Sequence, residues 1–213
     1  MTKEKYPLSL ALVDYIPVIL TIVGQYILLS AFENDFAAVY NYAMAGSFMM
    51  FTGGFLKSTW KTIIAANETD IRWMENSLFP FLAPGACLFA WASFCAQRAA
   101  QNLEPVSILI PVIISAAFLL WSISRINKPG KWFLPLVLLL TLSMGVITWN
   151  AWTLASINNN PLAAWLFIVS FLISLITAGV SRRAATIKMQ WVMEISNSFS
   201  AAFFVLAALK LFS

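Results

Sequence analysis

Seven stretches of the chain are almost continuously apolar, and short polar connections separate them. Each stretch is about 18 to 25 residues long, which at about 1.5 Å of helical rise per residue crosses a hydrocarbon layer about 30 Å thick. Backbone groups in lipid must be hydrogen-bonded within the protein, so each stretch is predicted to be a transmembrane helix. The predicted spans are Leu8–Phe32, Phe36–Leu56, Asn76–Gln97, Val106–Ile123, Trp132–Leu154, Leu162–Val180 and Trp191–Phe212.

The composition supports this class of protein. Hydrophobic residues make up 61% of the chain and charged residues only 10%, with a mean hydropathy of +0.81. A typical soluble domain carries about 25% charged residues. The sequence therefore predicts an all-α membrane protein, a bundle of seven transmembrane helices that forms one transmembrane domain over residues 1–213.

The basic residues predict the orientation. Of the thirteen Lys and Arg residues, only Arg98 and Lys210 fall on one side of the predicted topology. By the positive-inside rule, the side with the other eleven is cytoplasmic. We therefore expect a cytoplasmic N-terminus, an outer C-terminus and a bacterial inner membrane location. The net charge of +4 is explained by loops facing anionic headgroups, so the expected partner is the lipid bilayer and not a nucleic acid.

Two short motifs recur in the two halves of the chain. The pattern T-x-G-x-x-basic occurs at Thr52–Lys57 and Thr177–Arg182, and M-E-x-S occurs at Met74–Ser77 and Met193–Ser196. The matches indicate a parallel internal repeat with a 3+1+3 plan. Chance similarity between membrane helices is the alternative, and the unequal spacing of the motifs requires a loop insertion. The predicted units are repeat A at about 8–97, a linker helix at about 105–125 and repeat B at about 132–213.

The 3+1+3 plan resembles the layout of the SWEET sugar transporters and the PnuC vitamin transporters. The segment Trp149-Asn150-Ala151-Trp152 looks like the Trp-rich substrate motif of the PnuC proteins. That segment is too short to identify a family, and the resemblance is one of layout only. It implies a membrane carrier for a small solute.

Asp14 is the first candidate functional residue, because an ionisable side chain inside a span costs about 2.5–3.5 kcal/mol on insertion scales. Pro17 follows three residues later and frees the carbonyl of Val13 from its helical hydrogen bond. A carboxylate beside a free carbonyl suits a cation, a proton or a substrate donor, and Pro17 is a hinge candidate. Two structural alternatives remain open: a partner for a loop Lys or Arg, and a neutral acid hydrogen-bonded to another helix.

Glu194 is the second candidate, with Asn197 and Ser198 following on the same helix face. Helix packing with a glutamate that reaches towards the interface explains the pattern equally well. We expect Asp14 and Glu194 to point into the bundle, with at least one lining a cavity open to the cytoplasm. Two carboxylates within about 6 Å would favour sharing one proton, which is a basis for coupling.

Glu75 and Asn76 open the third predicted span, and Pro80 and Pro84 follow as hinge candidates. A doubly interrupted helix is one way in which transporters build a binding site. Membrane helices also tolerate proline without function. An exposed ion pair between Glu75 and Arg72 is the structural alternative.

A further candidate lies in the outer half, where aromatic and amide side chains occur together. Such a group suits a small organic ligand, whereas anchoring of Trp side chains at the interface is the simpler interpretation. The residues are Gln25, Asn41, Trp149, Asn150 and Trp152.

Several residue types and motifs do not occur in the sequence, and their absence reduces the number of functions to be considered. The chain has no His and only two Cys, both in the third span, so we predict no metal site and no cofactor. No phosphate-binding loop or nucleophile elbow occurs, so no catalytic residue is predicted and an enzyme is not expected. An enzyme that acts on lipids through carboxylate residues is kept as an alternative. The favoured function is a carrier or channel for an unknown small molecule, coupled to protons through Asp14 and Glu194. The alternative is a membrane sensor or an assembly partner, with the oligomeric state open.

Overall fold

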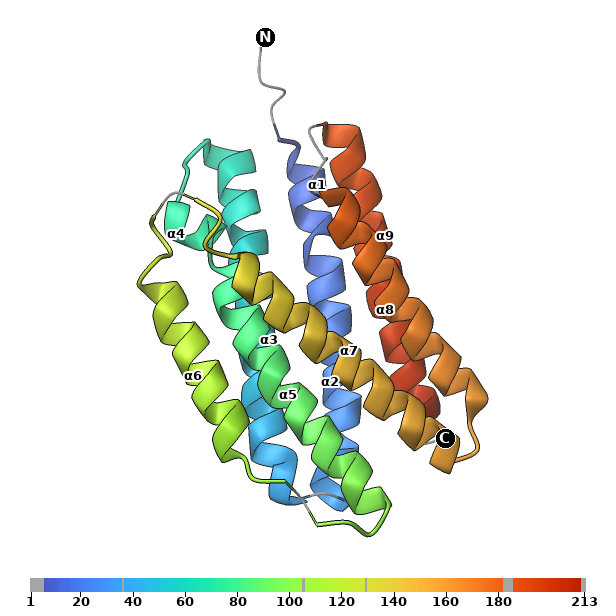
Figure 1. The fold of residues 1–213 in the computed structure, drawn as a ribbon. Helices are drawn as coiled ribbons and strands as arrows, with labels where there is room; N and C mark the ends of the chain where they lie inside the picture. The colour runs from blue at the N-terminus through green and yellow to red at the C-terminus, as the bar shows by residue number, and fades with distance from the viewer. Residues whose placement is uncertain (1–5, 36, 105, 129, 182–185, 212–213) are drawn as a thin grey trace.

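The computed structural model describes residues 6–35, 37–104, 106–128, 130–181 and 186–211. These residues form nine helices and no strand (Figure 1). The helices are α1 (Leu8–Val13), α2 (Tyr15–Asp35), α3 (Ala37–Asn67), α4 (Arg72–Glu75), α5 (Leu78–Ala100), α6 (Leu109–Ile123), α7 (Leu134–Ile157), α8 (Pro161–Ser181) and α9 (Ile187–Leu211). The prediction of an all-α protein is therefore confirmed.

Five helical stretches in the described part of the chain are long and apolar enough to cross a membrane: Leu8–Ser30, Arg72–Ala100, Leu134–Ile157, Pro161–Gly179 and Ile187–Leu211. They support an integral membrane bundle. The other two predicted spans differ from the expectation. α6 has only 15 residues and begins at Leu109 rather than Val106, where the Leu109 amide donates to Ser107 Oγ. α3 has 31 residues but carries polar side chains along its length, and it continues eleven residues beyond the expected end at Leu56.

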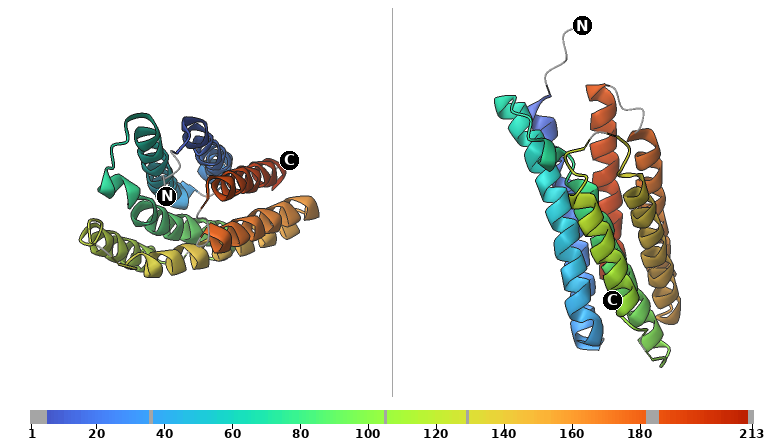
Figure 2. Two further views of the ribbon diagram at one scale, coloured as in Figure 1. Left: turned by 90° about the horizontal axis from the view of Figure 1, so that it is seen from above. Right: turned by 60° about the vertical axis from the view of Figure 1, so that its left-hand side comes forward.

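The helices form a ring around the bundle axis. The order of neighbours is α2, α3, α5, α7, α8, α9 and back to α2, and α6 packs outside the ring against α5 (Figure 2). α1 begins at one end of the bundle and α9 ends at the other (Figure 1). The end where α3 terminates and α5, α7 and α9 begin is called the basic end, because it carries the described residues Lys61, Arg72, Arg125, Lys128, Lys131 and Lys188.

α3 and α5 approach so closely that their backbones touch. A Cβ atom on Gly46 would lie 2.6 Å from the carbonyl oxygen of Gly85, and one on Gly85 would lie 2.6 Å from the carbonyl oxygen of Gly46. Gly53, two turns further along α3, would place a Cβ 2.8 Å from the carbonyl oxygen of Leu78. Small residues at such crossings are typical of membrane helix pairs, because close backbone approach maximises van der Waals contact.

The apolar core fills the half of the bundle away from the basic end. Its members come from the later part of α2, α5, α7 and α9 and the early part of α3 and α8, and many are alanines. Small side chains let these helices pack closely, so this half is filled by protein. The fully buried members include Ala43, Ala86, Ala92, Ala96, Ala155, Ala163, Ala207 and Ala208.

Two of the three predicted hinges, Pro17 and Pro80, lie near an interruption of a helix, and Pro84 does not. The first span is broken at Asp14, between α1 and α2, three residues before Pro17. The observed stretch Arg72–Ala100 is interrupted at Asn76 and Ser77, between α4 and α5, so Pro80 lies in the first turn of α5, where proline is tolerated. Pro84 lies inside α5, and its carbonyl accepts a hydrogen bond from Ser115 Oγ of α6 at 3.1 Å.

Candidate functional site

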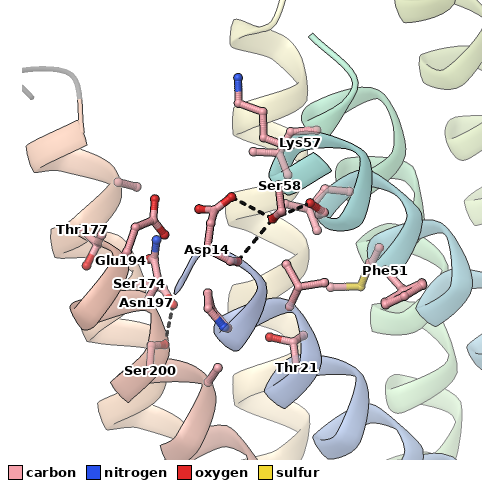
Figure 3. A pocket seen from close by; sticks show the side chains of 18 of the residues that line it. Asp14, Thr21, Phe51, Lys57, Ser58, Ser174, Thr177, Glu194, Asn197 and Ser200 are labelled. Carbon is pink, nitrogen blue, oxygen red and sulfur yellow. Dashed lines mark hydrogen bonds between the residues drawn. The ribbon is translucent and has the colours of Figure 1, made fainter. Parts of the chain in front are cut away.

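A cavity of about 810 Å³ lies inside the ring, in the half of the bundle nearer the basic end. Its lining comes from Tyr6, from Asp14 at the break between α1 and α2, and from α2, α3, α5, α7, α8 and α9. Figure 3 shows part of this lining, including Asp14, Ser58, Glu194 and Asn197. Cavities of about 300–1,000 Å³ are typical of small-molecule sites.

Three charged side chains meet at this cavity. Lys61 Nζ of α3 lies 2.6 Å from Asp14 Oδ1 and 2.7 Å from Glu194 Oε1 of α9. The side chains of Lys61, Asp14 and Glu194 are 17%, 10% and 5% exposed. Because one ammonium contacts both acids at 2.6 and 2.7 Å, the two contacting carboxylate oxygens lie at most about 5.3 Å apart. We call these three residues the ion-paired centre.

The break between α1 and α2 positions Asp14. The second carboxylate oxygen, Oδ2, accepts a hydrogen bond from Ser58 Oγ of α3 at 2.7 Å (Figure 3). Ser58 lies one turn before Lys61, so both side chains reach Asp14 from the same face of α3. Each oxygen of Asp14 therefore has a partner, and the acid is held at the cavity wall.

We expected Asp14 and Glu194 to point into the bundle, and both acids line the same cavity there. The structural alternative for Asp14 is also realised, since a lysine pairs with it. The sequence pattern did not indicate Lys61, which lies 47 residues from Asp14 and 133 residues from Glu194. Gly54, Ser58 and Lys61 follow a helical spacing that continues past the expected span end at Leu56, and this spacing could have located the lysine.

One wall of the cavity is polar and comes from α8 and α9. Asn197 lines the cavity, and Ser200 follows it on α9. The Ser200 and Ser170 hydroxyls donate to each other's main-chain carbonyl oxygens at 2.7 and 2.9 Å, and Ser174 Oγ lies 2.7 Å from Ser200 Oγ. The sequence pattern indicated Asn197 but none of these three serines. Ser198, expected beside Glu194, instead donates to the Glu194 carbonyl within its own helix at 2.8 Å.

The facing wall is apolar and comes from α5 and α7. No charged side chain of the described residues projects from these two helices into the cavity. The cavity therefore has a polar side and an apolar side. The apolar lining of α5 and α7 is Leu78, Phe79, Leu82, Phe89, Leu140, Met144 and Ile147.

Gln25 marks the deep end of the cavity. Gln25 is 2% exposed, and its Nε2 donates to the thioether of Met50 at 3.1 Å. Oε1 has no hydrogen-bond partner among the described residues. A buried amide oxygen without a partner costs about 1–3 kcal/mol, so a bound donor at this place would be stabilised.

A second, smaller cavity of about 170 Å³ contains Glu75 and Asn76. Lys57 borders both cavities, donates to the main-chain oxygen of Glu75 at 2.9 Å and lies 4.0 Å above the ring of Trp60. Burial is the largest effect on Lys57, which follows the expected end of the second span, and it lowers the pKa of the ammonium to about 8. Asn76 Nδ2 donates to the Ile126 carbonyl at 2.8 Å.

The expected alternative of an ion pair between Glu75 and Arg72 is not found among the described contacts. Arg72 is exposed, and the charged neighbour of Glu75 is instead Lys57. Glu75 directly precedes the interruption at Asn76 and Ser77, and its main-chain oxygen accepts from Lys57 of α3. Glu75 and Asn76 therefore lie apart from the main cavity.

The aromatic and amide residues of the outer half do not form the expected pocket. Trp149 is 68% exposed, whereas Asn150 is 1% exposed and donates to Ser93 Oγ of α5 at 2.9 Å. Consecutive helix positions lie about 100° apart, so these two side chains face different sides. Trp152 packs edge-on against Trp165 at 5.6 Å between ring centroids. Within the described residues, none of the three lines either cavity.

Gln25 and Asn41, expected in the same outer pocket, also separate. Gln25 lies in the main cavity, and Asn41 is exposed on the surface of α3. The expected outer pocket is therefore not formed by the described residues, and the candidate functional site is the central cavity.

Comparison with known proteins identifies no relative: no family model, no curated protein and no solved structure matches the chain. The layout resemblance to SWEET and PnuC transporters therefore has no support from these comparisons, and the cavity itself is the basis for inferring a function.

Proposed function

We propose that the protein is a membrane carrier for a small solute, which binds in the central cavity and is coupled to protons through the ion-paired centre. We also propose that α3 and α6 cross the bilayer together with the five long apolar helices. One observation carries the proposal: a cavity of about 810 Å³ inside an apolar bundle combines a buried Lys61–Asp14–Glu194 cluster with uncharged polar groups. Ionisable groups at membrane depth typically mark solute or proton pathways.

The arrangement of the helices supports alternating access. If repeat A comprises α2, α3 and α5 and repeat B comprises α7, α8 and α9, the last helix of each repeat packs against the first helix of the other. A two-fold axis along the bundle would produce this pattern, with α6 as the linker outside the ring. Carriers commonly move one such repeat against the other around a central site. The filled core at the far end and the cavity near the basic end match one end state of such a cycle.

Proton coupling is supported by the charge balance of the ion-paired centre, in which two acids share one ammonium. A second carboxylate charge near the first is unfavourable in a low-dielectric site, and a proton would relieve it. Among the described residues, the other ionisable groups that interact with this centre are Tyr6 and Lys57. Burial raises the pKa of the Tyr6 phenol to about 12, so Tyr6 stays neutral at physiological pH.

The test is solute-driven proton movement in proteoliposomes that contain a pH-sensitive dye. A panel of uncharged, cationic and anionic solutes is added outside, and the proposal expects at least one to change the internal pH. Glu194→Gln should abolish the change without loss of folding. Glu104→Gln is the matched control, because Glu104 is exposed in the connection between α5 and α6. A proton flux that Glu194→Gln leaves intact would contradict the coupling role, and no response to any solute would contradict the carrier.

A further inference from the structure

The inner part of the cavity, beyond the ion-paired centre, is uncharged. The charged residues that line the cavity are Asp14, Lys57, Lys61 and Glu194. Gln25 lies eleven residues after Asp14 on α2, which is about 16 Å deeper at helical rise. Among the described lining residues, only neutral side chains occupy this depth, so a charged group placed there would be buried without a counter-ion.

The charges at the ion-paired centre are already engaged with one another. Lys61 contacts both carboxylates, and the second oxygen of Asp14 accepts from Ser58. The Lys57 ammonium is directed to the Glu75 main-chain oxygen and the Trp60 ring. A charged solute would have to replace these pairs, whereas a neutral solute would leave them in place.

The inner part offers hydrogen-bonding groups on one side only. Gln25 Nε2 donates to the Met50 thioether, which can only accept, so the atom without a partner among the described residues is the acceptor Oε1. Thr21 lies one turn before Gln25, and Asn197 faces the cavity from α9. The opposite side is formed by Phe89, Met144 and Ile147. A ligand that satisfies this surface needs a polar edge and an apolar face.

We propose that the inner part of the cavity binds an uncharged small molecule with an apolar, flat body and a polar edge that both donates and accepts hydrogen bonds. A simple member of this class is a primary amide joined to an aromatic ring through a methylene group. Its N–H group complements the unpartnered Oε1 of Gln25, and its ring packs against the α5 and α7 side. This inference rests on the proposed function only in taking the cavity as a solute-binding site.

The experiment compares three molecules that share one skeleton: 2-phenylacetamide, phenylacetate and 2-phenylethylamine, which are neutral, anionic and cationic. Each is added to the full-length protein in detergent, and the melting temperature is followed by intrinsic fluorescence. A ligand that binds only the folded state stabilises it by mass action. We expect the amide to raise the Tm by about 3 °C at ten times its Kd, and the two ions to give no comparable shift.

The matched variants are Gln25→Leu and Gln97→Leu. Both residues are buried glutamines whose Oε1 has no partner among the described residues, but Gln97 does not line the cavity. Gln25→Leu should abolish the shift given by 2-phenylacetamide, and Gln97→Leu should preserve it. If Gln25→Leu does not fold, Asn197→Leu is the second variant, and it is expected to weaken the shift from α9, on the polar side of the cavity.

Three results would overturn the inference: a larger shift with either ion, no shift with any of the three molecules, or a shift that survives in Gln25→Leu. The outcome is separable from that of the carrier proposal. Gln25-dependent binding without any solute-driven proton flux would retain this inference and remove the carrier. Proton flux driven by charged solutes, without binding of the amide, would retain the carrier and remove this inference.

Discussion

Lys61 Nζ lies 2.7 Å from Glu194 Oε1, although 133 residues separate the two positions in the chain. The same ammonium contacts Asp14 at 2.6 Å, so one side chain of α3 connects the break between α1 and α2 with α9. The three residues line the cavity together, and each acid depends on the same ammonium for its ion pair.

Removal of the lysine should therefore destabilise the bundle. Lys61→Met leaves two largely buried carboxylates without a counter-ion, and breaking such a cluster typically costs about 3–5 kcal/mol. We expect the lower end of this range, since Lys61 is 17% exposed. Unfolding in detergent by denaturant measures the change. The triple variant Asp14→Asn, Lys61→Met, Glu194→Gln should recover much of the loss, and equal stability of Lys61→Met and the parent would contradict the cluster.

The close crossing of α3 and α5 predicts a steric effect. Gly46→Ala introduces a Cβ at 2.6 Å from the Gly85 carbonyl oxygen, which forces the two backbones apart. We expect a loss of about 2 kcal/mol or more in the free energy of unfolding, as is usual for overpacked sites. Gly145→Ala is the control, because its nearest atom would lie 3.8 Å away, and it should be neutral or stabilising. Equal stability of the two variants would show that the helices do not cross at Gly46.

The burial of Lys57 predicts that the stability of the fold depends on pH above neutrality. Its pKa in the folded protein is about 8, below the ordinary value of 10.5, because burial disfavours the ammonium. Between these two pH values the unfolded chain binds more protons at this position, so stability should rise as the pH increases from 8 to 10.5. Below pH 8 the cost of burying the charge is fully present.

The comparison of Lys57→Met with the parent isolates this contribution. The variant should be relatively more stable at pH 7, and the difference in Tm should shrink as the pH approaches 10.5. Lys188→Met serves as the exposed-lysine control with which the Lys57→Met variant is compared at each pH. A constant difference for Lys57→Met would show that the lysine is not buried.

The charge asymmetry predicts the orientation of the chain. With eleven of thirteen basic residues on one side, a reporter fused after Ser213 should report the non-cytoplasmic side. Two separate fusions at this position, one to alkaline phosphatase and one to green fluorescent protein, give complementary signals. Fluorescence from the C-terminal fusion would mean that one of the predicted spans, with α3 and α6 the first suspects, does not cross.

Replacement of Asn150 is expected to lower the stability of the bundle without changing ligand binding. Its amide is buried and donates to Ser93 Oγ between α7 and α5. Asn150→Ala should lower the free energy of unfolding by about 1–3 kcal/mol, because it leaves a cavity and removes a buried hydrogen bond. The shift produced by 2-phenylacetamide should stay unchanged, since Asn150 does not line the cavity. Loss of that shift in a folded variant would return the outer Trp149–Trp152 segment to consideration as a site.

Hydrophobic length and periodicity determined much of the fold in advance. The positions of the helices, the break near Pro17 and the inward direction of Asp14 and Glu194 follow from local rules, because the cost of exposing backbone or charge to lipid acts on each segment separately. The same rules explain why Trp149 is exposed, as an interfacial anchor would be.

Only the tertiary structure decided which side chains meet. The pairing of Lys61 with two acids, the contact between Gly46 and Gly85, and the serine cluster at Ser200 depend on the rotation and register of helices distant in sequence. Hydropathy carries little information about rotation, since lipid-facing and core-facing surfaces of a membrane helix are both apolar. Asn150 and Trp149 illustrate this. They are neighbours in the sequence and were predicted to share a pocket, but they lie on different sides of the helix.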